Sequence, residues 1–251
     1  MRTLILPDCH LRWPLQDKIV RFESPDNVIH MGDTFDQFYD SPELNADAAK
    51  WLKKRLHDPK WTFVESNHNI HYRLAANITR CSGFTKEKFD AINSILTPDD
   101  WARQKWYHVQ DNILFTHAGL HSCYAPKLNN IKDVVSKLDQ HISFSEIELK
   151  KNMPNWLYGA GVSRGGLFPV GGILWCDESE FKPIKGVSQI FGHTPSGPKL
   201  FNGKNRCFFK NGQKFNLNED ININLDSREG SWYGVIEDQT LTVRKFDLLN
   251  N

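Results

Sequence analysis

The sequence has no marked excess of either charge, since its 251 residues include 31 Lys and Arg against 30 Asp and Glu. Such a balance gives no global field that would draw the chain to nucleic acid or to an anionic membrane. No apolar run reaches the length that crosses a bilayer, and Asp8 and His10 interrupt the short apolar start before the core of a secretory signal is complete. We therefore expect a cytoplasmic protein without a membrane partner, for which nucleic acid could matter only as a substrate.

Cysteine is also scarce, with five residues, an odd number, and no Cys-x-x-Cys pair. This pattern argues against a disulfide framework and for free thiols in a reducing compartment. Internal repeats and low-complexity segments are missing as well. A chain of this length with 39% hydrophobic residues can bury a substantial core. We expect one α/β domain over residues 1–251.

One apolar run ends in two carboxylates. Residues 28–31 are rich in large and β-branched side chains, and Gly32 follows them, with Asp33 and Asp36 three residues apart. The run predicts an inner strand of a parallel sheet, and the glycine allows the backbone to turn where the strand ends. Ligands in open α/β sheets bind at such carboxyl ends. The turn is therefore a candidate catalytic segment.

The same arrangement occurs four more times, because other short apolar runs also lead into polar side chains that can bind metals. The runs at 4–6, 62–64, 113–115 and 190–191 precede Asp8-Cys9-His10, Ser66-Asn67-His68, Thr116-His117-Ala118-Gly119 and Gly192-His193-Thr194-Pro195. Asp, Asn and His offer the oxygen and imidazole ligands that suit manganese, iron, zinc or nickel, and the set contains no thiolate cluster. One such tripeptide could arise by chance, but five in order could not. The sequence therefore predicts a metal centre at the ends of five strands.

These five motifs, in this order, resemble those of the calcineurin-like metallophosphoesterases. Residues 117–120, 174–177 and 191–195 are most similar to the branch that holds small bacterial and phage-type serine/threonine protein phosphatases and diadenosine tetraphosphatases. The resemblance extends from Asp8 to about Asp226. It implies an α/β fold in which two packed mixed β-sheets are flanked by helices, a four-layer α/β/β/α sandwich.

The resemblance also implies a set of metal ligands. Asp8, His10 and Asp33 would hold one divalent ion. Asp33, as the bridge, would hold the second ion together with Asn67, His117 and His193. Mn²⁺ is the expected metal, with Fe, Zn, Ni or Co as alternatives. Two such ions about 3.5–4 Å apart can clamp the attacking and leaving oxygens of a displacement at phosphorus, with a bridging hydroxide as the nucleophile.

In the same family pattern, His68 is the general acid that protonates the leaving group, and Asp36 orients it. The sequence departs from the pattern nearby. Gln37 stands where the protein-phosphatase branch has an arginine that binds the phosphoryl group, Ser66 stands where a glycine usually precedes Asn-His, and Asn69 replaces the usual acid. Arg164 and Arg73 are candidates for the missing guanidinium, and each could equally be an ordinary surface arginine.

We therefore predict a dinuclear metal-dependent phosphohydrolase. A phosphomonoesterase of the protein-phosphatase or dinucleoside-polyphosphatase type is expected, acting on a phosphoprotein, a nucleotide or a dinucleoside polyphosphate. The alternatives are a metal-dependent phosphodiesterase or nuclease and, from another class, a catalytically silent binding scaffold. A scaffold would have no need to retain the ligand set and the His68 and Asp36 pair.

Local patterns predict several further elements. Helices are expected over 15–22, from Ser41 as N-cap to 58, over 85–96, and between 121 and 155. The glycine-dense segment 159–172 could cradle a phosphate or could serve as a flexible connection. His30 lies inside a predicted strand and is expected in the core, whereas His71 and His121 lie near the motifs without an assigned role.

Overall fold

The computed structural model describes residues 1–37, 39–202 and 205–247, and it contains two six-stranded sheets. The strand order in the first sheet is β3-β2-β1-β11-β12-β9, and in the second it is β4-β5-β6-β10-β7-β8. The first sheet consists of β1 (Thr3–Leu6), β2 (Asn27–His30), β3 (Trp61–Phe63), β9 (Gln213–Asn216), β11 (Trp232–Glu237) and β12 (Thr240–Lys245). The second consists of β4 (His108–Gln110), β5 (Ile113–Phe115), β6 (Ser188–Phe191), β7 (Lys199–Asn202), β8 (Asn205–Phe208) and β10 (Asn222–Asn224).

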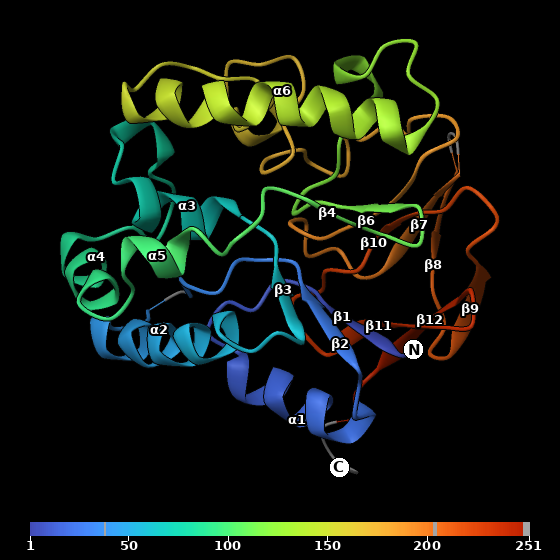
Figure 1. Cartoon of the computed structure of the whole chain (residues 1–251), viewed down its shortest axis with the longest axis horizontal. Coiled ribbons are helices and arrows are strands. Elements are labelled where there is room, and N and C mark those ends of the chain that lie inside the picture. The colour runs from blue at the N-terminus through green and yellow to red at the C-terminus, as the bar shows by residue number, and fades with distance from the viewer. Residues whose placement is uncertain (38, 203–204, 248–251) are drawn as a thin grey trace.

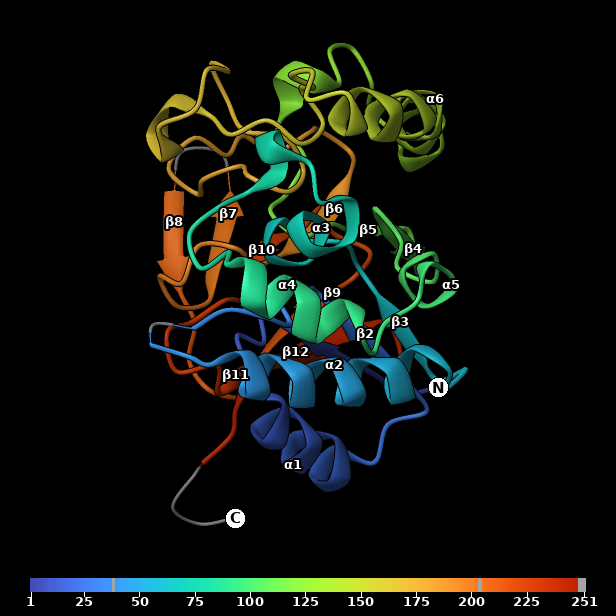
Figure 2. The same ribbon diagram turned by 90° about the vertical axis from the view of Figure 1, so that its left-hand side faces the viewer.

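The α-helices lie outside the two sheets (Figures 1 and 2). They are α1 (Trp13–Glu23), α2 (Pro42–Leu56), α3 (Asn67–Leu74), α4 (Lys86–Asn93), α5 (Pro98–Trp101) and α6 (Ile131–Lys150). Short 3₁₀ turns occur at η1 (Asn77–Thr79), η2 (Ser122–Tyr124) and η3 (Val162–Arg164). Within the described residues, no helix combines the length and apolarity that a membrane crossing requires.

Three apolar layers hold this arrangement together. Ile19 of α1 and Leu52 of α2 pack with Leu4 and other residues on the outer face of the first sheet. Alternate strand residues such as Ile5 fill the space between the two sheets, because successive side chains on a strand point to opposite faces. A third cluster joins the apolar face of α6 to the outer face of the second sheet. The predicted α/β fold with two mixed sheets flanked by helices is confirmed.

The local signals for helix termini are largely confirmed. Ser41 caps α2 by accepting the Leu44 N–H at 3.3 Å, and Pro42 occupies the first helical turn. The helix expected over 85–96 begins after Thr85 but ends at Asn93, three residues early. Residues 94–96 form a turn after the helix, and Thr97 then caps the next helix, α5, which begins at Pro98.

The directions of the strands determine where the loops that carry the predicted motifs emerge. β1 pairs in parallel with β2, and β2 pairs in parallel with β3. In the second sheet, β5, β6 and β10 are parallel neighbours. The loops that follow parallel strands emerge at the same edge of a sheet. The five predicted motifs follow β1, β2, β3, β5 and β6.

Candidate metal centre

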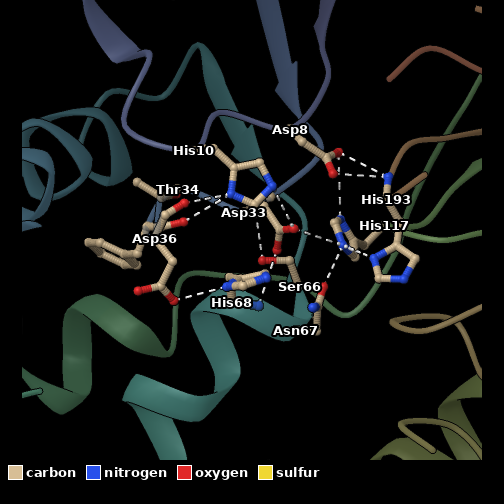
Figure 3. Close-up of polar contacts among 12 residues, drawn as sticks. Asp8, His10, Asp33, Thr34, Asp36, Ser66, Asn67, His68, His117 and His193 are labelled. Carbon is tan, nitrogen blue, oxygen red and sulfur yellow. Dashed lines mark hydrogen bonds and ion pairs between the residues drawn. The ribbon is translucent and has the colours of Figure 1, made fainter. Parts of the chain in front are cut away.

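All six predicted metal ligands lie together at the strand ends (Figure 3). Asp8, His10 and Asp33 form one group of potential ligands, and Asp33, His117 and His193 form another. Within each group, one donor atom from each residue lies within 4.8 Å of the others. Asn67 joins the second group, because its Oδ1 is 2.7 Å from His117 Nε2. Asp33 is shared by both groups, which is the position that the sequence assigned to a bridging carboxylate.

The imidazoles are oriented by their backbone partners. His10 Nδ1 is 2.8 Å from the Asp36 carbonyl oxygen, so Nε2 faces Asp33 Oδ2 at 3.4 Å. His117 Nδ1 is 2.9 Å from the Met31 carbonyl oxygen, so its Nε2 also faces the cluster. A ring that donates one N–H to a carbonyl presents the lone pair of its other nitrogen. Histidines that bind metals are typically oriented in this way.

The donor set fits divalent cations. With its Nδ1 near the Met31 carbonyl oxygen, His117 directs Nε2 to three other polar atoms: Asn67 Oδ1 at 2.7 Å, His193 Nδ1 at 3.1 Å and Asp33 Oδ2 at 3.4 Å. Burial opposes protonation of the ring, but Asp33 and Asp8 outweigh burial and raise the pKa of His117 to about 9. Asp33 is 2% exposed. Converging lone pairs around a buried carboxylate are costly without a positive charge. A cation among these oxygen and nitrogen donors would remove that cost, and the absence of sulfur donors suits the harder metals.

Two departures from the family pattern support the loop that carries Asp33. The Ser66 hydroxyl accepts the Asp33 N–H at 2.7 Å. Asn69 Oδ1 accepts the Thr34 N–H at 2.9 Å. Gly32 has a φ of 103°, and a Cβ at this position would lie 2.4 Å from the Ser66 Cβ, so no larger residue fits between the two motifs.

The predicted pair of His68 and Asp36 is formed beside the ligand groups. His68 Nδ1 is 2.9 Å from Asp36 Oδ2, and the other carboxylate oxygen accepts hydrogen bonds from Tyr72 at 2.6 Å and Lys88 at 3.1 Å. Burial opposes protonation of His68, but Asp33, Cys81 and Asp36 outweigh burial and hold its pKa well above the ordinary value. His68 is thus held in the charged form that can donate a proton.

The motifs did not reveal the roles of His71 and Cys81 in this network. His71 Nε2 is 3.0 Å from Asp36 Oδ2, and Cys81 Sγ is 3.2 Å from His71 Nδ1. Burial opposes ionisation of the Cys81 thiol, but the neighbouring histidines outweigh it and lower the pKa to about 7. The sequence indicates that His71 lies near His68, because a residue three positions further along a helix lies on the same face.

The two candidate arginines have different surroundings. Arg164 donates to Thr194 Oγ1 at 2.9 Å and pairs through Nε with Asp177 Oδ2 at 2.7 Å. Thr194 directly follows the candidate ligand His193 in the sequence. It lines a cavity of about 510 Å³. Arg73 instead lies between two carboxylates, since Glu65 and Glu146 are 2.7 and 2.8 Å from its guanidinium.

The glycine-dense segment 159–172 is closely packed. A Cβ on Gly166 would lie 2.0 Å from the Ala160 carbonyl oxygen, and one on Gly171 would lie 2.1 Å from the Trp175 carbonyl oxygen. These glycines allow close backbone contact. Many of the amides in the segment bind protein acceptors, and Glu180 alone accepts hydrogen bonds from Ser163 and Gly171. The glycines permit close packing of the segment that carries Arg164, and the amides that already bind protein acceptors are not available to a phosphate.

Comparison with known proteins identifies the fold. The sequence matches no protein-family profile, and no curated protein matches it. Among solved structures, a metallophosphoesterase from Sphaerobacter thermophilus aligns with 98% of this chain and 88% of its own, at 13% identity and a TM-score of 0.53. A cold-active protein tyrosine phosphatase aligns with 96% of this chain and 75% of its own, at 12% identity and a TM-score of 0.56. A protein serine/threonine phosphatase from Saccharomyces cerevisiae aligns with 100% of this chain and 81% of its own, at 15% identity and a TM-score of 0.50.

At these identities the comparisons establish the fold. The chain therefore has the metallophosphoesterase fold, and the resemblance that the strand-end motifs indicated is confirmed at that level. The site described above occupies the ends of the parallel strands in this fold.

Proposed function

We propose that this protein is a dinuclear metal-dependent phosphohydrolase, and specifically a phosphomonoesterase. The observation that carries the proposal is the sharing of Asp33 between two ligand groups, with the His68 and Asp36 pair beside them. Asp8, His10 and Asp33 would hold one divalent ion, and Asp33, Asn67, His117 and His193 the other. When bound, such ions supply Lewis acidity and an activated water for in-line attack at phosphorus.

The residues around the centre would handle the proton of the reaction. His68 directs Nδ1 to Asp36 at 2.9 Å, which leaves its Nε2–H to protonate the leaving oxygen. Asp36 stabilises the charged ring, and Tyr72 and Lys88 fix the carboxylate in turn. General acids held in this way contribute about 10²–10⁴-fold to rate.

Preference for a monoester rests on Arg164. A monoester dianion gains more than a diester from a cation beyond the metals, and a guanidinium suits phosphoryl oxygens. Gln37 supplies no such charge, and Arg73 is already neutralised by two carboxylates. Arg164 has one carboxylate partner, Asp177, and lines the cavity. The uncharged Gln37 is the observation that favours the second candidate, a phosphodiesterase.

A metal-reconstitution screen tests the proposal. The protein would be stripped of metal, refilled with Mn²⁺, and assayed on nitrophenyl phosphate, bis-nitrophenyl phosphate, phosphopeptides, nucleotides, dinucleoside polyphosphates and oligonucleotides. We expect metal-dependent hydrolysis with monoesters preferred. Asp33→Asn should abolish turnover and weaken both metal sites, because it removes the bridging charge. Full activity in the metal-free protein, confirmed by elemental analysis, would contradict the mechanism, and a diester preference would favour the second candidate.

A further inference from the structure

A second group of metal-type side chains lies beside the proposed centre. Donor atoms of Cys81, His71 and His68 lie within 4.8 Å of one another, and we call these three residues the thiol cluster. Cys81 Sγ is 3.2 Å from His71 Nδ1 and 3.8 Å from His68 Nδ1. Asp33, Asn67 and the other proposed ligands are not members of the thiol cluster. The proposed hydrolysis uses only His68 from it.

His71 already has the orientation of a metal ligand. Its Nε2 faces the Asp36 carboxylate at 3.0 Å, and its Nδ1 is 3.4 Å from the Cys81 N–H, which donates to it. Nδ1 is therefore an acceptor whose lone pair is directed to the side of Cys81. Histidines that bind metals through one nitrogen commonly donate the other N–H to a carboxylate. Asp36 would fill that supporting role here.

The chemistry of the thiol cluster differs from that of the proposed centre. One sulfur and two imidazole nitrogens favour Zn²⁺ over Mn²⁺, because thiolates are soft ligands. Cys81 lines the cavity of about 510 Å³, so an ion has a path to its sulfur. A water in that cavity would complete a tetrahedral set.

We propose that the thiol cluster is a third cation site, which favours Zn²⁺ over Mn²⁺ and is inhibitory when filled. On binding, the Cys81 thiol loses its proton to solvent and forms a Zn–S bond, while His71 Nδ1 and His68 Nδ1 form two Zn–N bonds. As the bond to His68 Nδ1 forms, the proton on that nitrogen also passes to solvent, and the hydrogen bond to Asp36 is lost. The ring can no longer be charged, so it cannot serve as a strong acid. The site itself is independent of the proposed function; only its inhibitory effect rests on that function.

The test compares Mn²⁺-loaded wild type, Cys81→Ser and Cys123→Ser. Cys123 is an exposed free thiol outside the thiol cluster and serves as the matched control. Each protein is exposed to Zn²⁺, freed of excess ion by gel filtration, and analysed for bound Zn²⁺ and Mn²⁺. Loading with Co²⁺ in place of Zn²⁺ shows any thiolate ligand by its charge-transfer absorption. Activity is normalised to that of the same protein without Zn²⁺.

We expect wild type and Cys123→Ser to bind an additional Zn²⁺ without losing Mn²⁺, and to show the thiolate absorption. Cys81→Ser should lose both signals and need a Zn²⁺ concentration higher by roughly tenfold or more for equal inhibition. Equal Zn²⁺ content in all three proteins, with Mn²⁺ displaced, would overturn the proposal. The metal counts and the absorption show whether Zn²⁺ binds the thiol cluster even if no phosphatase activity is found. Failure of this proposal can therefore be distinguished from failure of the proposed function.

Discussion

Removal of the His68 imidazole should slow catalysis without emptying the metal centre. The structure supports this separation, because the contact of His68 with the bridging carboxylate comes from its main chain. Its backbone N–H donates to Asp33 Oδ1 at 3.1 Å, and His68→Ala retains that bond. The side-chain nitrogen Nδ1 instead faces Asp36 and Cys81. The variant should therefore bind both metals with near wild-type stoichiometry.

The magnitude follows from the role of a general acid. A contribution of about 10²–10⁴-fold corresponds to about 3–5 kcal/mol of activation free energy, at 1.36 kcal/mol per factor of ten. The full loss is expected on a substrate with a strongly basic alkoxide leaving group, such as a phosphoserine peptide. Nitrophenolate leaves without protonation, so the loss on nitrophenyl phosphate should be much smaller.

The assay is kcat for both substrates, measured on Mn²⁺-loaded protein whose metal content is determined in the same preparation. Asp36→Asn provides a graded comparison, because it leaves the imidazole but removes the carboxylate 2.9 Å away that favours the charged ring. It should show the same leaving-group dependence in weaker form. Equal rate losses on both substrates, with metals retained, would refute the acid role of His68.

Two further predictions concern Arg164 and Glu23. Arg164→Ala should raise KM or lower kcat for nitrophenyl phosphate and affect bis-nitrophenyl phosphate less; an equal effect on both, or none, would contradict a role in binding the dianion. Glu23 is 5% exposed and accepts hydrogen bonds from Tyr233 at 2.6 Å and Arg244 at 2.9 Å. Burial opposes its ionisation, but Tyr233, Arg2 and Arg244 outweigh burial and lower its pKa. Its stabilising contribution is therefore present above the ordinary carboxyl pKa and is lost as the pH falls through the lowered value. Glu23→Gln should reduce the free energy of unfolding at pH 7 by about 1–3 kcal/mol and by less in acid, as measured by urea unfolding at both pH values; an equal loss at both would contradict this.

The sequence placed the candidate ligands at strand ends because that part of their geometry is local. Asp8 and Asp33 follow the parallel strands β1 and β2 of the first sheet, so strand pairing brings these two to one edge. His117 and His193 follow the parallel strands β5 and β6 of the second sheet, and only the packing of the two sheets joins the two pairs. The sequence also predicted Ser41 as the N-cap of α2, because the cap joins residues only three positions apart. Strand direction and hydrogen bonds between nearby residues determine this part of the structure.

The parts that could not be predicted depend on contacts between distant segments. Lys88 reaches Asp36 across 52 positions, and Arg73 reaches Glu146 across 73. No periodicity in the sequence encodes such pairs. In the sequence, Cys81 is one of five cysteines without a distinguishing motif, because its contact with His71 forms only when the chain folds back after α3. Composition could therefore argue against a disulfide framework, but it could not place one thiol beside the proposed general acid His68.

The place of β1 in its sheet has a consequence for the order of events during synthesis. β1 carries the loop of Asp8, and its two neighbours are β2 and β11, with Leu4 opposite both Val28 and Val235. On a translating ribosome, β2 emerges soon after β1, whereas β11 emerges only near the end of the chain. One edge of β1 thus stays unpaired until β11 has been made and is open until then to strands of other nascent chains. A product that stops before residue 232 would keep every proposed metal ligand in its sequence, yet it would lack the strand that closes this edge.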